Sequence, residues 1–314
     1  MKKETEQNVV EKKPSKRKYI YAAVCCVLLL IVALVFAALR WELKPDPESE
    51  KIIRKAAAKQ LNKDPNELTD EDFAKITSFA LRVNDLIPDP LDLPILISDI
   101  KLLRKFKNLK TIYLDNLKYP EKDIPKWKKY LIQLGILNLP EKSIIDLSPL
   151  RNLYKLEKLT ITRSDIKNIK PISKLRNLKS LLIICDQVSD LKPLKELTNL
   201  QTLVIGGDRI SYFKRTRTGY SQITDIEPIR DLSNLRRLEL HFIPISDLGP
   251  IAELKSLEIF EVSDIKVSGI EQIKGLKKLR RLNISRCPSI TDEQLRNLQE
   301  DMPQLRIKRD LMSF

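Results

Sequence analysis

One short motif recurs along the chain and restricts the folds that are open to it. In its clearest copy it reads Leu156-Glu157-Lys158-Leu159-Thr160-Ile161, with apolar residues at the first, fourth and sixth places. The first-place residue returns 22 residues later at Leu178, and again at Leu200. Further copies begin at Ile76, Leu109, Leu134, Leu235, Leu257 and Leu279. A fixed period in this range indicates a solenoid, in which stacked repeats bury one continuous core.

A second motif keeps step with the first. It reads Asp146-Leu147-Ser148-Pro149-Leu150 ahead of the copy at Leu156. Related phrases begin at Asn168, Asp190, Asp225 and Asp247. Asp and Asn side chains accept hydrogen bonds from nearby backbone N–H groups in turns. We therefore predict a structural role for these recurring carboxylates in the turns, not a catalytic one.

Together the two motifs resemble the bacterial leucine-rich repeats of internalin type, over about residues 76–307. The resemblance implies an α/β solenoid with a curved parallel sheet and a convex side that is mostly irregular or 3-10 helical. It also implies a helical N-cap, expected at 51–75, then repeats at 76–290 and a C-terminal cap at 291–314. The ninth place, usually Asn in this family, holds other residues such as Ser164, Asp186 and Cys287. The asparagine ladder of the family should therefore be incomplete, and the turns less regular.

The segments before the repeats carry helix signals. Residues 48–61 combine acids in the first turn with apolar residues suited to one helix face. Thr69 precedes a run of acids that includes Asp72, a pattern typical of a helix N-cap with a carboxylate three places on. Residues 40–50, which hold Pro45 and Pro47 among acids, are expected to form a stiff polar linker.

The N-terminus predicts a membrane anchor. Residues 19–39 form a run of 21 residues without a charge, which is long enough to cross a bilayer as a helix. Residues 1–18 hold seven Lys/Arg and three Glu, and positive flanks stay on the cytoplasmic side. We predict a cytoplasmic basic tail, a transmembrane signal anchor and extracytoplasmic repeats in a single-pass protein of the cell membrane. The alternative is secretion after cleavage of a signal peptide, whose apolar region is usually shorter.

Charge and cysteines leave the partner open. The net charge is +15, which permits acidic partners without choosing among them. Cys25 and Cys26 lie inside the apolar run, where acylation is an open question. Cys185 and Cys287 lie in different repeats, so we expect no disulfide between them, and the chain has no CxxC or Cys/His spacing for a metal.

The sequence offers little for catalysis. His241 is the only histidine, so we predict that neither a Ser-His-Asp triad nor a histidine metal cluster can be assembled. Gly206-Gly207 is too short to be a phosphate-cradling loop. We therefore predict a protein that is not an enzyme and that needs no cofactor or metal.

Binding is better supported, because the third, fifth and seventh places of each motif should face away from the core on the concave side. Leu182, Ile184 and Val204 are apolar at these places, which indicates an interaction site. The alternative is that an inserted loop covers them. The candidate partner-binding residues on the strands are Tyr113, Lys158, Thr160, Leu182, Ile184, Val204, Arg237, Glu239, His241 and Arg281.

That insertion separates the copies at Leu200 and Leu235, which are 35 residues apart instead of 22. Around 211–222 it is rich in cationic and aromatic residues, which suit a protein hot spot, a glycan or an anionic chain. A solvated loop without function is the alternative. The candidate residues are Tyr212, Phe213, Lys214, Arg215, Arg217 and Tyr220.

The prediction is a membrane-anchored, extracytoplasmic recognition module that binds another protein through the concave sheet and the basic aromatic loop. The alternative is a cell-envelope structural protein whose basic surface holds an anionic polymer or glycan. Nucleic acid is disfavoured as a partner, because a domain outside the cytoplasm rarely meets it.

Overall fold

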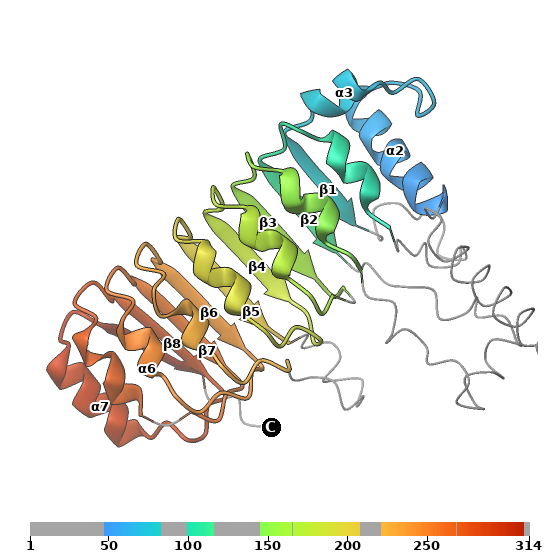
Figure 1. The fold of residues 1–314 in the computed structure, drawn as a ribbon. Helices are drawn as coiled ribbons and strands as arrows, with labels where there is room; N and C mark the ends of the chain where they lie inside the picture. The colour runs from blue at the N-terminus through green and yellow to red at the C-terminus, as the bar shows by residue number, and fades with distance from the viewer. Residues whose placement is uncertain are drawn as a thin grey trace, which may run out of the picture. The chain divides into compact units, whose positions relative to one another are not determined.

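The fold is a stack of parallel strands. The computed structural model describes residues 47–82, 99–115 and 145–310, apart from 165, 208–220 and 268. In this part, nine strands form one sheet in which neighbours in sequence are neighbours in space (Figure 1). The strands are β1 (Ser78–Arg82), β2 (Thr111–Asp115), β3 (Lys158–Thr162), β4 (Ser180–Ile184), β5 (Thr202–Gly206), β6 (Arg237–His241), β7 (Ile259–Ser263), β8 (Arg281–Ser285) and β9 (Arg306–Asp310). The predicted leucine-rich repeat solenoid is confirmed.

The apolar places of the motif build the core. Leu178, Leu181 and Ile183 are fully buried, as are the equivalent residues of the neighbouring repeats. The fourth and sixth places point to the same side because side chains alternate along a strand. The β4–β5 register sets Leu181 beside Leu203 and Ile183 beside Ile205. Each repeat therefore buries its apolar residues against those of the next repeat.

Short helices return the chain from one strand to the next and lie on one side of the sheet (Figure 1). The Asp190 carboxylate accepts a hydrogen bond from the Lys192 N–H at 2.9 Å. The same bond forms at Asp99, Asp146, Asn168, Asp225 and Asp247. This confirms the structural role predicted for these side chains. The helices are η2 (Lys101–Lys105), η4 (Ser148–Asn152), η5 (Lys170–Lys174), η6 (Lys192–Glu196), η7 (Glu227–Ile229), α6 (Gly249–Ala252) and η8 (Ile270–Gly275).

Longer helices pack at both ends of the stack. Helix α2 (Pro47–Leu61) contacts β1 and η2, and α3 (Asp70–Lys75) contacts η2. At the other end, α7 (Asp292–Asp301) packs on η8. The Thr69 side chain accepts from the Asp72 N–H while the Asp72 carboxylate accepts from the Thr69 N–H. The predicted N-cap of α3 at Thr69 is therefore confirmed. Helices packed at the ends of a solenoid keep water from its core.

Two of the turns that follow the strands are held by arginine–aspartate pairs. Arg163 and Arg286 each follow their strand with positive φ, a conformation that non-glycine residues adopt at a cost. The Arg163 Nε donates to Asp115 Oδ1 at 2.9 Å, and the Arg286 Nε donates to Asp264 Oδ1 at 2.7 Å. A second guanidinium nitrogen also reaches the same carboxylate in each pair. This two-point contact fixes turns that lack the asparagine of the family.

One predicted repeat is absent from the described sheet. The motif at Leu134 predicted a strand between those at Leu109 and Leu156, but β2 pairs directly with β3. Residues 116–144, which contain this motif, lie outside the described residues. In sequence this copy differs from the others, because Ile124 stands at the place ten residues before the first Leu, where most other copies have Asp or Asn, and Pro140 stands at the seventh place.

Several predictions fall outside the described residues. They include the cytoplasmic tail 1–18, the anchor 19–39 and, in the inserted loop predicted around 211–222, residues 211–220. Within the residues that the structure describes, no helix combines the length and apolar character needed to span a membrane. Strands β5 and β6 are direct neighbours, so the insertion does not interrupt the sheet. Cys185 and Cys287 are buried, and no disulfide joins them.

Candidate functional site

The candidate surface is the face of the sheet opposite the short helices, the predicted concave face. It carries the third, fifth and seventh places of each motif on strands β2 to β8. All the strand residues predicted to bind a partner lie at these places: Tyr113, Lys158, Thr160, Leu182, Ile184, Val204, Arg237, Glu239, His241 and Arg281. The loop candidates Tyr212, Phe213, Lys214, Arg215 and Arg217 lie outside the described residues, as does Tyr220.

The apolar part of this face lies on β4 and β5. Leu182 stands directly beside Val204 in the strand register, with Thr160 on its other side. Leu182 and Ile184 are half-buried, whereas Val204 and Thr160 are only 8% and 5% exposed. An outward place therefore does not guarantee exposure, because side chains on strands about 4.8 Å apart shield one another. On β4 and β5, the apolar surface that a partner can reach is formed by Leu182 and Ile184.

The charged part lies on β6 and β7, where the side chains bind one another. The Arg237 guanidinium contacts Glu239 at 2.5 Å and Glu261 at 2.7 Å. The ring of His241 lies between two partners, with Nδ1 2.7 Å from Ser263 Oγ and Nε2 3.2 Å from Glu239 Oε2. These contacts arise because the register sets Glu239 beside Glu261 and His241 beside Ser263.

The contacts around Glu239 keep its carboxylate ionised. The hydrogen bond from His241 and the contact with Arg237 lower the pKa of Glu239, against the opposing effect of burial. The bond to Glu239 in turn raises the pKa of Arg237. Both groups are therefore held in their charged forms, and their side chains are fixed in one arrangement.

The structure corrects the prediction that no Ser-His-carboxylate arrangement can be assembled. Ser263 and Glu239 both contact His241, since one is its neighbour on the adjacent strand and the other lies two places away on its own strand. Acyl transfer also needs donors aimed at an oxyanion. The backbone N–H groups of β6 and β7, strands inside the sheet, are used in its ladders. Among the described residues, the trio orders His241, and the backbone N–H groups of these two strands are not available to form an oxyanion hole.

Gly206 marks the boundary between the two parts. It occupies the seventh place of β5, beside His241 of β6. A Cβ atom built on Gly206 would overlap the carbonyl oxygen of His241 and lie 2.9 Å from the His241 Cβ. The close approach of the two strands therefore requires glycine at position 206, the first residue of the Gly206-Gly207 pair.

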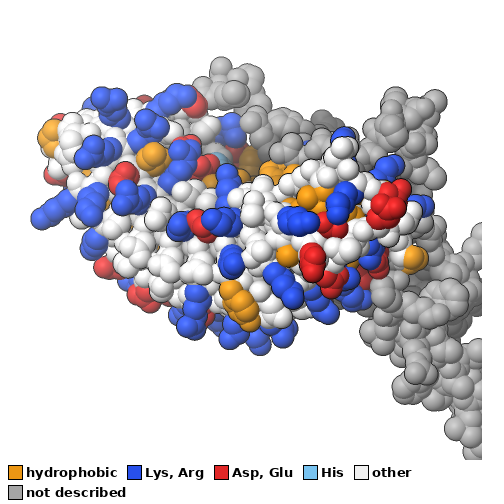
Figure 2. Space-filling model, turned by 90° about the horizontal axis from the view of Figure 1, so that it is seen from above, with side chains coloured by type: hydrophobic (Ala, Val, Ile, Leu, Met, Phe, Trp, Pro, Cys, Tyr) orange, Lys and Arg blue, Asp and Glu red, His pale blue; other side chains and the backbone are white. Residues whose placement is uncertain are grey.

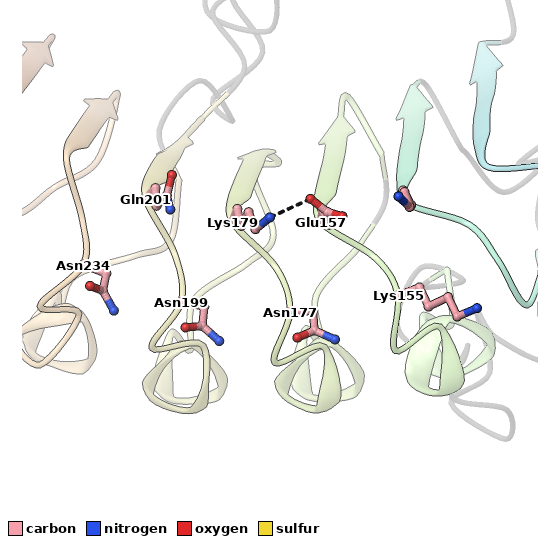
Figure 3. Close-up of a pocket in the computed structure, with 8 residues that line it drawn as sticks. Lys155, Glu157, Asn177, Lys179, Asn199, Gln201 and Asn234 are labelled. Atoms are coloured by element: carbon pink, nitrogen blue, oxygen red, sulfur yellow. Dashed lines mark hydrogen bonds and ion pairs between the residues drawn. The ribbon is translucent and has the colours of Figure 1, made fainter.

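A row of asparagines, missed by the sequence reasoning, lines the turns that lead into the strands (Figure 3). Each side-chain amide donates to a backbone carbonyl of the preceding repeat: Asn177 to Tyr154 at 2.7 Å, Asn199 to Arg176 at 2.9 Å and Asn234 to Thr198 at 2.9 Å. This ladder satisfies backbone carbonyls in the turns before the strands, whereas the ninth place lies in the turns after them. The signal was present as an Asn immediately before the first Leu of several motifs.

The same turns border a shallow groove of about 480 Å³. Its wall holds the three asparagines with Lys110, Lys155, Glu157, Lys179, Gln201 and no apolar side chain. Lys179 pairs with Glu157 at 2.8 Å, and the Lys155 ammonium donates to the Asn108 amide oxygen at 2.7 Å. Figure 2 shows Lys and Arg side chains spread along the face that it presents, with acidic ones between them. The groove is therefore polar and mostly basic.

Comparison with known proteins identifies the fold. No sequence-family profile matches the chain, and no curated protein matches it in sequence. Among solved structures, it is similar to internalin C2 from Listeria monocytogenes, with 22% identity and a TM-score of 0.60 over 82% of this chain and 92% of the other. It is also similar to a leucine-rich repeat protein from Leptospira interrogans, with 18% identity and a TM-score of 0.54 over 77% and 51% of the two chains. These likenesses show that the chain has the leucine-rich repeat fold of bacterial proteins.

Proposed function

We propose that the chain is a recognition module that binds another protein through its concave face. The observation that carries the proposal is the half-buried apolar pair Leu182 and Ile184 on β4, with the ordered charges of β6 and β7 further along the same face. Protein interfaces commonly combine an apolar centre with a polar rim. The sheet also fixes the backbone before binding, which lowers the entropic cost of association.

The charged part suits the rim of such an interface. Arg237 keeps 38% of its side-chain surface exposed although it contacts two carboxylates. A side chain already held in place loses little conformational freedom when a partner arrives. Charge pairs at a rim select partners more than they add affinity. We assign Leu182 and Ile184 to affinity, and Arg237, Glu239 and His241 to partner choice.

The proposal includes the predicted location. Residues 19–39 anchor the chain in the cell membrane, residues 1–18 stay in the cytoplasm, and the repeats face outward. The inserted loop at 211–222 contributes cationic and aromatic contacts to the same partner. A reporter fused after Phe314 should be active outside the cytoplasm, and activity confined to the cytoplasm would contradict this orientation.

A double substitution tests the binding surface. The full chain and its Leu182→Asp/Ile184→Asp variant serve as bait in membranes of the native cell, with captured proteins quantified by mass spectrometry. The proposal expects one defined protein to be enriched by the wild type and reduced at least tenfold by the variant. Lys174→Asp, on η5 at the other side of the sheet, is the control and should retain capture. Equal capture by all three baits would refute the assignment.

A second candidate function, binding of an anionic envelope polymer or glycan, is favoured by the polar groove at the asparagine row. Lysines and amides in a line suit a long hydroxylated or anionic chain. Such binding should weaken steeply with salt and be insensitive to Leu182→Asp. Lys110→Ala/Lys179→Ala should weaken it, whereas protein recognition at the concave face should show the opposite pattern.

A further inference from the structure

The C-terminal end of the concave face places like charges opposite one another. The β8–β9 register sets Arg281 beside Arg306 and Asn283 beside Lys308. These four side chains and Ile307 line a hollow of about 270 Å³. Arg281, Arg306 and Lys308 are all exposed, so their polar ends are accessible to a ligand.

Two of these cations have no counterion in the described part of the chain. The guanidinium groups of Arg281 and Arg306 make no hydrogen bond or ion pair with any residue that the structure describes, in contrast to Arg237 with its two carboxylates. Lys308 contacts Asp310 at 3.2 Å, and both side chains are more than half exposed. Three cations less one carboxylate leave the hollow with a charge of about +2.

This arrangement is unfavourable for the sheet alone. Like charges directly opposite on neighbouring strands destabilise a pairing. Charges on an edge strand can prevent aggregation. That explanation covers Arg306 and Lys308, because β9 is the last strand of the described sheet. It does not cover Arg281, which lies on the inner strand β8.

We propose that this hollow is a binding site for a phosphoryl group in its dianionic form. Guanidinium groups bind phosphate oxygens with two parallel N–H donors, and two guanidinium groups lie side by side here. Lys308 adds a point charge and Asn283 adds amide N–H donors. The site charge of about +2 matches a phosphate monoester, which carries a charge of about −1.5 to −2 at neutral pH.

Ile307 also lines the hollow. Its backbone N–H points away from β8, because the Arg306 N–H donates to the Arg280 carbonyl and these directions alternate along a strand. The donors for an anion are therefore the side chains of Arg281, Arg306, Lys308 and Asn283.

The site lies on β8 and β9, apart from Leu182 and Ile184 on β4. It does not depend on the protein-binding proposal, and each can fail without the other. Calorimetric titration of the full chain tests it with inorganic phosphate and phenyl phosphate at pH 7.5 and constant ionic strength. Dimethyl phosphate, a singly charged diester, separates a terminal phosphoryl group from a phosphodiester backbone or lipid headgroup.

Saturable binding of both dianions is expected, with the diester at least tenfold weaker. Arg281→Ala and Arg306→Ala should each weaken phenyl phosphate at least tenfold. Lys174→Ala removes the same charge from the other side of the sheet and should change affinity less than twofold. At pH 5, below the second pKa of about 6 of the ester, its affinity should fall several-fold while that of sulfate stays constant.

Three results would overturn the proposal: no saturable binding, equal affinity for the diester, or a loss in Lys174→Ala as large as in Arg281→Ala. Folding is checked independently, because Arg281→Ala/Arg306→Ala removes a like-charge contact. The double variant should have a melting temperature equal to or above that of the wild type in phosphate-free buffer. A lower melting temperature would show that the arginines support the sheet, and would also contradict the account.

Discussion

Two neighbouring parts of the concave face share one backbone design and differ in what they present. On β4 and β5 the outward places hold Leu182 and Val204, while on β6 they hold Arg237 and Glu239. The inward places of all these strands are fully buried apolar residues in continuous register. The repeat therefore dictates the core and leaves the outward places free to vary. Function must be sought in those variable places.

Truncating core side chains tests whether the two parts pack on an equivalent hydrophobic core. These substitutions should have the largest effect on the free energy of unfolding. Leu181 lies behind the apolar part and Leu238 behind the charged part, and both are fully buried. Replacing either with Ala should lower the free energy of unfolding by about 2–5 kcal/mol, through lost burial and a cavity. Urea denaturation should give similar losses for the two variants. A difference above about 3 kcal/mol, the width of that range, would show that the parts do not rest on an equivalent core.

The boundary between the parts can be tested at Gly206. Gly206→Ala would force the new methyl group against the His241 backbone, so unfolding should become easier by about 1–3 kcal/mol. Gly275→Ala is the matched control, because its Cβ would lie 3.9 Å from the Lys255 ammonium and clash with no backbone atom. Thermal unfolding of both variants checks this. Equal melting temperatures of the Gly206→Ala and Gly275→Ala variants would mean that β5 and β6 can move apart without loss of stability.

Acid should act on the charged part. Since the pKa of Glu239 is lowered in the folded state, its ionisation contributes stability above the unfolded pKa of about 4.3. That stability is lost as pH falls through the lower folded value. Glu239→Gln should therefore lower stability at pH 7 by about 1 kcal/mol and reduce the loss between pH 5 and 3.

Melting temperatures measured from pH 7 to 3 give the comparison. Glu196→Gln, an exposed carboxylate paired with Arg176 on the helical side, serves as the control and should leave the profile unchanged. Part of the acid loss should persist in Glu239→Gln, because Lys63 and Lys75 lower the pKa of Asp72 in the N-cap. A profile identical to that of the wild type would show that the network adds nothing to stability.

The smallest effect on stability is expected at the exposed edge of the apolar part. Lys158→Ala, on β3 beside the apolar pair, should change the free energy of unfolding by no more than about 0.5 kcal/mol. The side chain is exposed and contacts no described carboxylate in an ion pair. Urea denaturation measures the change. A loss above 1 kcal/mol would mean that this surface supports the fold as well as binding.

Much of the fold could be predicted because it depends on local chemistry. The turn bond of Asp190 and the cap at Thr69 each involve residues two or three places apart, and the core follows from side-chain alternation. The site depends on which repeats become neighbours. The contact between Ser263 and His241 joins residues 22 places apart, and depends on register. The strand expected at Leu134 stays a prediction, because that motif lies outside the described residues.

Site-specific photo-crosslinking tests the central claim most directly. A photoreactive phenylalanine analogue replaces Leu182 on the concave face in one variant, and in another it replaces Tyr154, which is 59% exposed on the helical side. Both full-length variants are irradiated in the native cell envelope. The account predicts one defined protein adduct at Leu182, and at least tenfold less of it at Tyr154. No adduct at Leu182, or the same adduct at equal yield from Tyr154, would contradict recognition through the concave face.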